Sequence, residues 1–270
     1  MTHAVGIQMS SGPNVGANLI EAARLIDQAA DAGAKLIVLP ENFASMPMNE
    51  EDRLEIAESD GHGPVQDFLS SRARQHRVWI VGGTVPLLAN ANGKTRASSL
   101  LFNDRGDRVA RYDKIHLFDV ELENGEQYNE SGYIEAGHEI VVADTPFGRL
   151  GMSVCYDLRF PELYRSLLDQ GAEILAVPSA FTEITGKAHW QVLVRARAIE
   201  NLAYVIAPGQ GGYHVNGRET FGDSMIVDPW GQILDRLPRG SGIVSAELNR
   251  KRLEAVRTSL PSIYHRQLKS

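Results

Sequence analysis

The chain has 270 residues, of which 43% are hydrophobic and 23% charged, a composition typical of a globular protein with a large core. The net charge is -7 and no basic stripe is present, which argues against a nucleic-acid partner. The single cysteine excludes an internal disulfide. No apolar run reaches the roughly 20 residues that span a bilayer, and the N-terminus lacks the features of a signal peptide. We therefore expect a cytoplasmic protein with no membrane partner.

Short apolar runs alternate with amphipathic stretches along the chain. The runs predict strands over 3–9, 35–40, 78–85, 98–103, 108–111, 149–155, 172–180, 202–209, 223–231, 232–237 and 242–248. The amphipathic stretches predict helices over 18–32, from 64 onward, and over 161–171 and 187–201, with a short exposed helix over 249–257.

The order of these elements indicates an α/β fold. Runs such as LIVL and EILAV are apolar throughout, as expected for strands that are covered on both faces. Strands alternate with helices and then follow one another near the C-terminus, which favours mixed sheets with helices outside. No linker, composition break or repeat interrupts the chain, so we expect one domain over 1–270.

Residues 112–139 show little periodicity, and we predict a long loop there. A long loop inside a compact domain is usually functional.

The only cysteine, Cys155, ends the predicted strand 149–155 and precedes a polar turn and a helix that begins at Pro161. Two interpretations are open from these local features. A lone cysteine is commonly a small buried hydrophobe. A strand followed by a sharp turn and a helix can instead expose a nucleophile and place backbone N–H groups near a developing oxyanion.

A cysteine nucleophile needs a base, and histidine is the usual partner. Of the 8 histidines, His116 in the long loop and His189 on a predicted helix are the best placed. No motif distinguishes either one, so a Cys–His enzyme remains a second hypothesis.

Two further charged residues stand out by position. Glu41 directly follows the strand KLIVLP, and ligands of α/β proteins gather at the carboxyl ends of strands. Lys114 lies in YDKIHLF, where the long loop begins. Taken singly, the first could be a loop carboxylate or helix cap and the second a surface lysine.

Three segments together resemble the signature segments of the nitrilase superfamily of carbon–nitrogen hydrolases. These are LPENF around Glu41, YDKIHLFDV around Lys114 and SVCYDLRFPELYR around Cys155. Their order matches the Glu–Lys–Cys triad of that family. Two longer stretches, VPSAFTEITGKAHWQVLVRARAIEN and DSMIVDPWGQIL, are similar to its Nit amidase branch. The resemblance covers essentially the whole chain and favours the nucleophile interpretation of Cys155.

The resemblance implies a four-layer α-β-β-α sandwich that pairs as a homodimer or higher homo-oligomer through the helices at 161–171 and 187–201. It implies that Glu41 is the base, Lys114 the cation and Cys155 the nucleophile. Glu130, just before Ser131, matches a second glutamate of the family, and Glu126 is a weaker alternative.

The resemblance also implies substrate contacts. The backbone N–H of Tyr156 would stabilise the oxyanion, and Phe181 and Thr182 would line the pocket. Arg159 matches an arginine of related carbamoyl hydrolases that holds a substrate carboxylate; the alternative is a structural pair with Glu162 or Asp157. We interpret PGQGG (208–212) as a flexible turn near the pocket mouth.

The implied activity is hydrolysis of a small linear carboxamide to a carboxylate and ammonia through a thioester, without a metal or organic cofactor. PSAFT (178–182) resembles the type that acts on deaminated glutathione. The ω-amidase type, which acts on α-ketoglutaramate or α-ketosuccinamate, more often has Asn in place of Thr182. An N-carbamoyl hydrolase, an acyltransferase and a non-catalytic interaction module are further hypotheses; the intact Glu–Lys–Cys set argues against the last.

Overall fold

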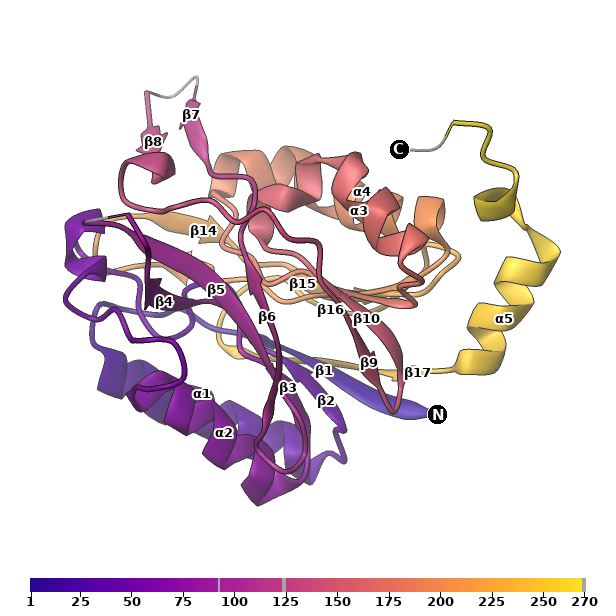
Figure 1. The fold of residues 1–270 in the computed structure, drawn as a ribbon, viewed down its shortest axis with the longest axis horizontal. Helices are drawn as coiled ribbons and strands as arrows, with labels where there is room; N and C mark the ends of the chain where they lie inside the picture. Colours follow the sequence, from indigo (N-terminus) through magenta and orange to yellow (C-terminus); the bar gives the residue numbers. More distant parts are fainter. Residues whose placement is uncertain (92, 123–124, 269–270) are drawn as a thin grey trace.

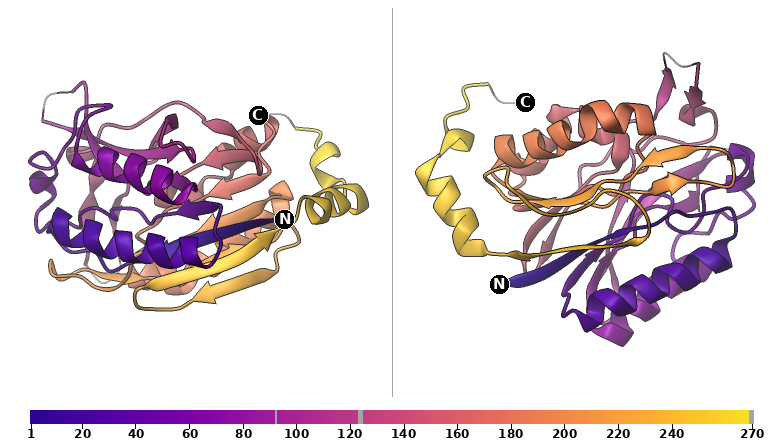
Figure 2. Two further views of the ribbon diagram at one scale, coloured as in Figure 1. Left: turned by 90° about the horizontal axis from the view of Figure 1, so that it is seen from below. Right: turned by 180° about the vertical axis from the view of Figure 1, so that it is seen from behind.

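The computed structural model describes residues 1–91, 93–122 and 125–268. Two β-sheets stack face to face, and a pair of helices covers the outer face of each sheet (Figures 1 and 2). This arrangement is the predicted four-layer α-β-β-α sandwich.

The first sheet has the order β17-β1-β2-β3-β5-β4, with β6 also paired to β5. Its strands β1, β2 and β3 are parallel and its outer strands antiparallel. Helices α1 (Val15–Asp31) and α2 (Pro64–His76) cover its outer face. The strands are β1 (Thr2–Gln8), β2 (Leu36–Val38), β3 (Trp79–Val81), β4 (Val85–Leu88), β5 (Thr95–Phe102), β6 (Arg108–Asp113) and β17 (Gly242–Leu248).

The second sheet has the order β16-β15-β12-β11-β10-β9, with β10, β11 and β12 parallel. Helices α3 (Pro161–Asp169) and α4 (Glu183–Asn201) cover its outer face. The strands are β9 (Val142–Thr145), β10 (Gly148–Met152), β11 (Ile174–Ala176), β12 (Tyr204–Ala207), β15 (Ser224–Val227) and β16 (Ile233–Leu237).

Strand β2 shows why the central strands are apolar throughout. Successive side chains of a strand point to opposite faces. Leu36 and Val38 accordingly join the core between the two sheets, whereas Ile37 packs into the core under α1 and α2. Both faces of the strand are buried, so its sequence does not alternate between apolar and polar residues.

Three predictions about local structure need correction. The predicted strand 78–85 is two strands, β3 and β4, because the chain turns at Gly82–Thr84. Gly83 has φ +49°, and a Cβ there would lie 2.1 Å from the carbonyl oxygen of Pro40. Only glycine allows this close approach.

The predicted loop 112–139 contains a hairpin of β7 (Asp119–Glu121) and β8 (Gln127–Asn129), followed by the 3₁₀ helix η2 (Glu130–Gly132). PGQGG is not a flexible turn. Gln210 is fully buried and donates to the carbonyl oxygen of Glu41, and Gly211 begins β13 (Gly211–Tyr213), which pairs with β14 (Glu219–Phe221).

The basic segment near the C-terminus forms the predicted helix, α5 (Arg250–Ser259), and η4 (Ser262–Tyr264) follows it. Within the described ranges, no helix combines the length and apolar character required to cross a membrane.

Candidate active site

A cavity of about 400 Å³ opens where β2 and β6 of one sheet and β10 of the other end. Its volume lies in the range of pockets that hold small-molecule ligands. All eight predicted site residues line it: Glu41, Lys114, Glu130, Cys155, Tyr156, Arg159, Phe181 and Thr182.

Glu41 lies three residues beyond the end of β2, and its side chain is buried. The next residue, Asn42, has φ +56° and donates its N–H to the hydroxyl of Thr84 at 2.8 Å. The Glu41 carbonyl accepts from Gln210 at 3.0 Å. These two hydrogen bonds fix the backbone on both sides of the peptide bond after Glu41, so that its carboxylate lines the cavity.

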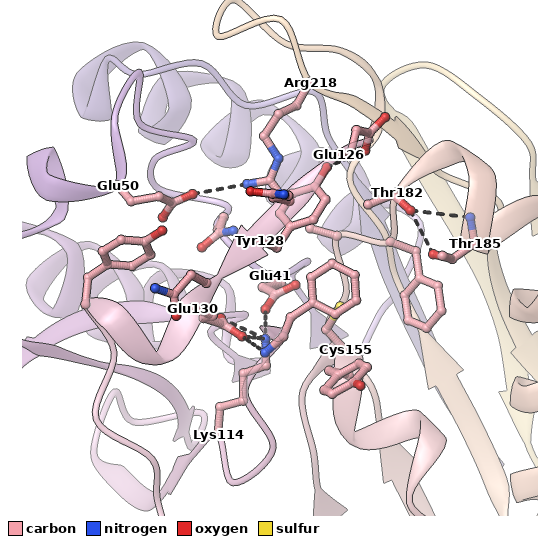
Figure 3. Close-up of a pocket in the computed structure, with 18 of the residues that line it drawn as sticks. Glu41, Glu50, Lys114, Glu126, Tyr128, Glu130, Cys155, Thr182, Thr185 and Arg218 are labelled. Atoms are coloured by element: carbon pink, nitrogen blue, oxygen red, sulfur yellow. Dashed lines mark hydrogen bonds and ion pairs between the residues drawn. The ribbon is translucent and has the colours of Figure 1, made fainter. Parts of the chain in front are cut away.

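Lys114 follows β6 directly and is only 2% exposed. Its Nζ lies 2.9 Å from Glu41 Oε1 and 2.9 Å from each carboxylate oxygen of Glu130 (Figure 3). Burial alone would lower the pKa of this ammonium, but the charges of Glu130 and Glu41 outweigh burial and raise the pKa well above its ordinary value. Lys114 is therefore a permanent cation in the pocket.

The second glutamate that binds Lys114 is Glu130, at the start of η2, and not Glu126. The Oε2 atom of Glu130 also accepts the N–H of Phe118 at 2.6 Å. This bond ties the β7–β8 hairpin to the lysine. Glu126 lines the cavity further out and accepts from the hydroxyl of Tyr128.

Cys155 begins the 3₁₀ helix η3 (Cys155–Arg159) with φ +47°. A left-handed conformation is unusual for a residue with a side chain and marks a constrained turn. The Cys155 N–H donates to the carbonyl of Pro178 at 2.9 Å. The predicted order of strand, turn and helix is confirmed, but the predicted strand 149–155 is too long, because β10 ends at Met152, three residues before the thiol.

The buried carboxylate of Asp157 fixes this turn. It accepts the N–H of Val154 at 2.8 Å, the hydroxyl of Tyr112 at 2.6 Å, and the N–H of His116 at 3.1 Å. The His116 ring nitrogen Nδ1 is a further 2.8 Å contact. Asp157 therefore ties the turn that carries Cys155 to the segment that carries Lys114.

The thiol is protonated at rest. Burial raises the pKa of Cys155 well above its ordinary value, and the charge of Glu41 raises it further, while Lys114 opposes both. A nucleophilic role for this sulfur would consequently require a base, and Glu41 is the carboxylate beside it.

A family comparison agrees with this geometry. The model of the carbon–nitrogen hydrolase family matches residues 4–258. The chain belongs to the carbon–nitrogen hydrolase family.

Individual relatives of this hydrolase align over most of its length. The deaminated glutathione amidase of Synechocystis is 47% identical over 266 residues, which cover 97% of each chain. The C. elegans NitFhit protein superposes with a TM-score of 0.92 and 34% identity; the match covers 98% of this chain and 65% of the nematode protein. Saccharomyces cerevisiae Nit3, a member of branch 10 of the nitrilase superfamily, superposes with a TM-score of 0.86 and 32% identity over 96% of this chain and 94% of that one.

Arg159 of this hydrolase does not pair with Glu162 or Asp157. Its guanidinium lies over the rings of Phe181 at 5.1 Å and Tyr156 at 5.8 Å, and it contacts His189 Nδ1 at 3.1 Å. The alternative of a structural ion pair is thus wrong. An arginine stacked on two aromatic rings, in the same 3₁₀ helix as Cys155, can present its planar fork to a carboxylate.

Thr182 has a structural role as well as a place on the cavity wall. It is the N-cap of α4, and its hydroxyl accepts the N–H of Thr185. Phe181 packs against Trp190 with a ring-centroid distance of 4.9 Å.

The two histidines considered as bases do not line the cavity of the hydrolase. His116 is bound to Asp157 and stacks on Phe160 at 3.7 Å, and His189 contacts Arg159. Across the part of the chain that the structure describes, His, Cys, Asp and Glu side chains form no group of three or more that could hold a metal ion.

The outer wall of the cavity consists of residues that the sequence does not predict as site residues. This wall includes charged and polar side chains from η1 (Glu50–Arg53), from β8 and from the turn between β13 and β14: Glu50, Arg53, Tyr128, Asn216 and Arg218. The residues are far apart in the chain and share no periodicity, so only the folded structure brings them together.

Proposed function

We propose that this carbon–nitrogen hydrolase is an amidase with Cys155 as its nucleophile and deaminated glutathione as its substrate. The observation that carries the proposal is the buried group in Figure 3. A thiol shares one cavity with an ammonium that two carboxylates hold at 2.9 Å. Such a set can move a proton and stabilise an oxyanion without a cofactor.

The proposed reaction begins when Glu41 takes the thiol proton and Cys155 attacks the amide carbonyl. The oxyanion is stabilised by Lys114 and by the backbone N–H of Tyr156. Glu41 then returns the proton to the leaving nitrogen, the C–N bond breaks, and a thioester remains. Water, deprotonated by Glu41, hydrolyses the thioester. Glu130 holds Lys114 in position throughout.

The substrate assignment rests on the name of the Synechocystis relative. Deaminated glutathione carries an α-keto carboxylate on the acyl side of its γ-amide and a Cys-Gly dipeptide on the leaving side. In this proposal Arg159 binds the keto-acid carboxylate, and Phe181 and Thr182 line the acyl side. Cleavage would release Cys-Gly, whereas a primary ω-amide would release ammonia.

A substrate panel tests this proposal. We expect the purified protein to cleave deaminated glutathione with a kcat/KM at least tenfold above that for α-ketoglutaramate or α-ketosuccinamate, measured as Cys-Gly and ammonia release. The reverse preference would make the protein an ω-amidase. Cleavage only of N-carbamoyl substrates, acyl transfer without hydrolysis, or no reaction at all would contradict the amidase proposal.

We also propose that residues 1–270 work as one domain in a cytoplasmic homodimer. The outer face of α4 supports the dimer, because Ile184, Val192 and Ile199 are exposed on it at helical spacing.

The substitution Val192→Glu is expected to convert the dimer to a monomer, because a buried, unpaired carboxylate is costly at an interface. Light scattering after gel filtration measures the mass. Val215→Glu is the matched control, since Val215 is similarly exposed but lies on the β13–β14 turn. A monomeric unsubstituted protein, or a Val192→Glu dimer of unchanged stability, would contradict this interface.

A further inference from the structure

Three arginines line the cavity, and one of them, Arg218, lies on the outer wall, on the side away from Lys114 and Cys155 (Figure 3). Arg218 enters from the turn between β13 and β14. Glu50 of η1 and Tyr128 of β8 face it from two other segments. The proposed mechanism has no task for this guanidinium.

Arg218 is only loosely held by its acidic neighbour. Its guanidinium lies 3.4 Å from Glu50, whereas Arg53 binds the same carboxylate at 2.5 Å. Arg53 is buried and therefore holds Glu50 more firmly. Glu126, the other acid on this wall, is bound at 2.7 Å by the hydroxyl of Tyr128. Arg218 Nη1 also contacts Met46 Sδ at 3.9 Å, and the Tyr128 hydroxyl is a further neighbour. A guanidinium has five N–H donors, so Arg218 keeps donors for a ligand.

The backbone that carries Arg218 is fixed. Its N–H donates to the side chain of Asn216 at 3.1 Å, and Asn216 donates to the carbonyl of Pro47 at 2.8 Å. The buried ring of His214 is held between the carbonyl of Ser11 and the hydroxyl of Thr220. The Arg218 side chain also lies over the ring of Tyr128 at 5.0 Å. A binding group gains affinity when its support is already ordered.

We propose that Arg218 binds a carboxylate on the leaving amine of the substrate. This inference rests on the proposed function, in which the substrate carries one carboxylate on each side of the scissile amide. Arg159 shares η3 with Cys155 and suits the short acyl arm. The dipeptide arm on the leaving side spans about 7 Å when extended and suits an arginine on the far wall. A guanidinium can bind a carboxylate through two parallel hydrogen bonds.

The test compares deaminated glutathione with its analogue in which the terminal glycine carboxylate is a carboxamide. We expect the unsubstituted enzyme to lose about 10- to 100-fold in kcat/KM on the analogue, the range of a hydrogen-bonded charge. Arg218→Gln should lose a similar factor on the parent substrate, and the two losses should not multiply when combined. Arg239→Gln is the matched control. Arg239 binds Glu219 and Glu183 beside the same hairpin and should keep the enzyme's preference for the parent substrate.

Two outcomes overturn the assignment of Arg218 and leave the proposed function intact. One is equal cleavage of both substrates by the unsubstituted enzyme. The other is an Arg218→Gln loss of equal size on both substrates, which would indicate a structural role. Failure of the unsubstituted enzyme to cleave either substrate would overturn the proposed function and this subsite with it.

Discussion

Substitution of Cys155 by alanine is expected to lower amide turnover by about 10⁵-fold or more, because a nucleophile and its base act as a unit and neither compensates for the loss of the other. Cys155→Ser keeps a weaker nucleophile and should retain trace activity. The direct measurement is intact-mass spectrometry of enzyme quenched during turnover. An acyl adduct on the unsubstituted protein should be absent from the alanine variant.

The loss of turnover in Cys155→Ala identifies the nucleophile only if the variant remains folded. The substitution removes one sulfur atom from a residue that already contacts the cavity, so we expect about 1 kcal/mol or less of lost stability. Thermal unfolding checks this expectation. A folded alanine variant with more than about 1% of the turnover, or an adduct mapped elsewhere, would show that Cys155 is not the nucleophile.

The sequence predicts the inner half of the site because that half is tied to strands. Glu41 and Cys155 each follow an apolar run, and such runs are recognisable without a structure. Lys114 follows the largely polar strand β6, and only the family resemblance singles it out. The carboxyl ends of parallel strands lie at one edge of a sheet. The stacking of two sheets then brings these strand ends together. The family resemblance predicts which of the three residues acts as base, cation and nucleophile.

The outer half of the site depends on contacts that leave no local pattern. Arg218 meets Glu50 across 168 residues of chain, through a hairpin turn and a short 3₁₀ helix. Asp157 is a similar case. Its sequence neighbourhood suggests a pair with Arg159, but the folded chain brings Tyr112 and His116 to it. Proximity along the chain is a poor guide to partners of a buried carboxylate, which takes whichever donors the fold buries beside it.

The substitution Glu41→Gln should separate the reactivity of the thiol from turnover of the substrate. The charge of Glu41 helps to raise the pKa of Cys155, and Lys114 lowers it. A neutral glutamine removes the first effect and leaves the second, so the thiol pKa falls and the thiolate fraction at neutral pH rises. Iodoacetamide should therefore alkylate the variant faster than the unsubstituted enzyme at pH 7, and its alkylation profile should shift to lower pH.

Turnover of the same variant should fall by about 10²- to 10⁴-fold, the range for loss of a general acid–base group. A more reactive sulfur does not help, because no carboxylate remains to protonate the leaving nitrogen or to deprotonate water. Glu130→Gln is the matched comparison. It removes the other carboxylate bound to Lys114 but keeps Glu41 beside the thiol. Its turnover should fall through lost positioning of the lysine, without the acceleration of alkylation that Glu41→Gln produces. Slower alkylation of Glu41→Gln, or turnover within threefold of the unsubstituted enzyme, would show that Glu41 is not the base. Glu130, the other carboxylate bound to Lys114, would then be the candidate base.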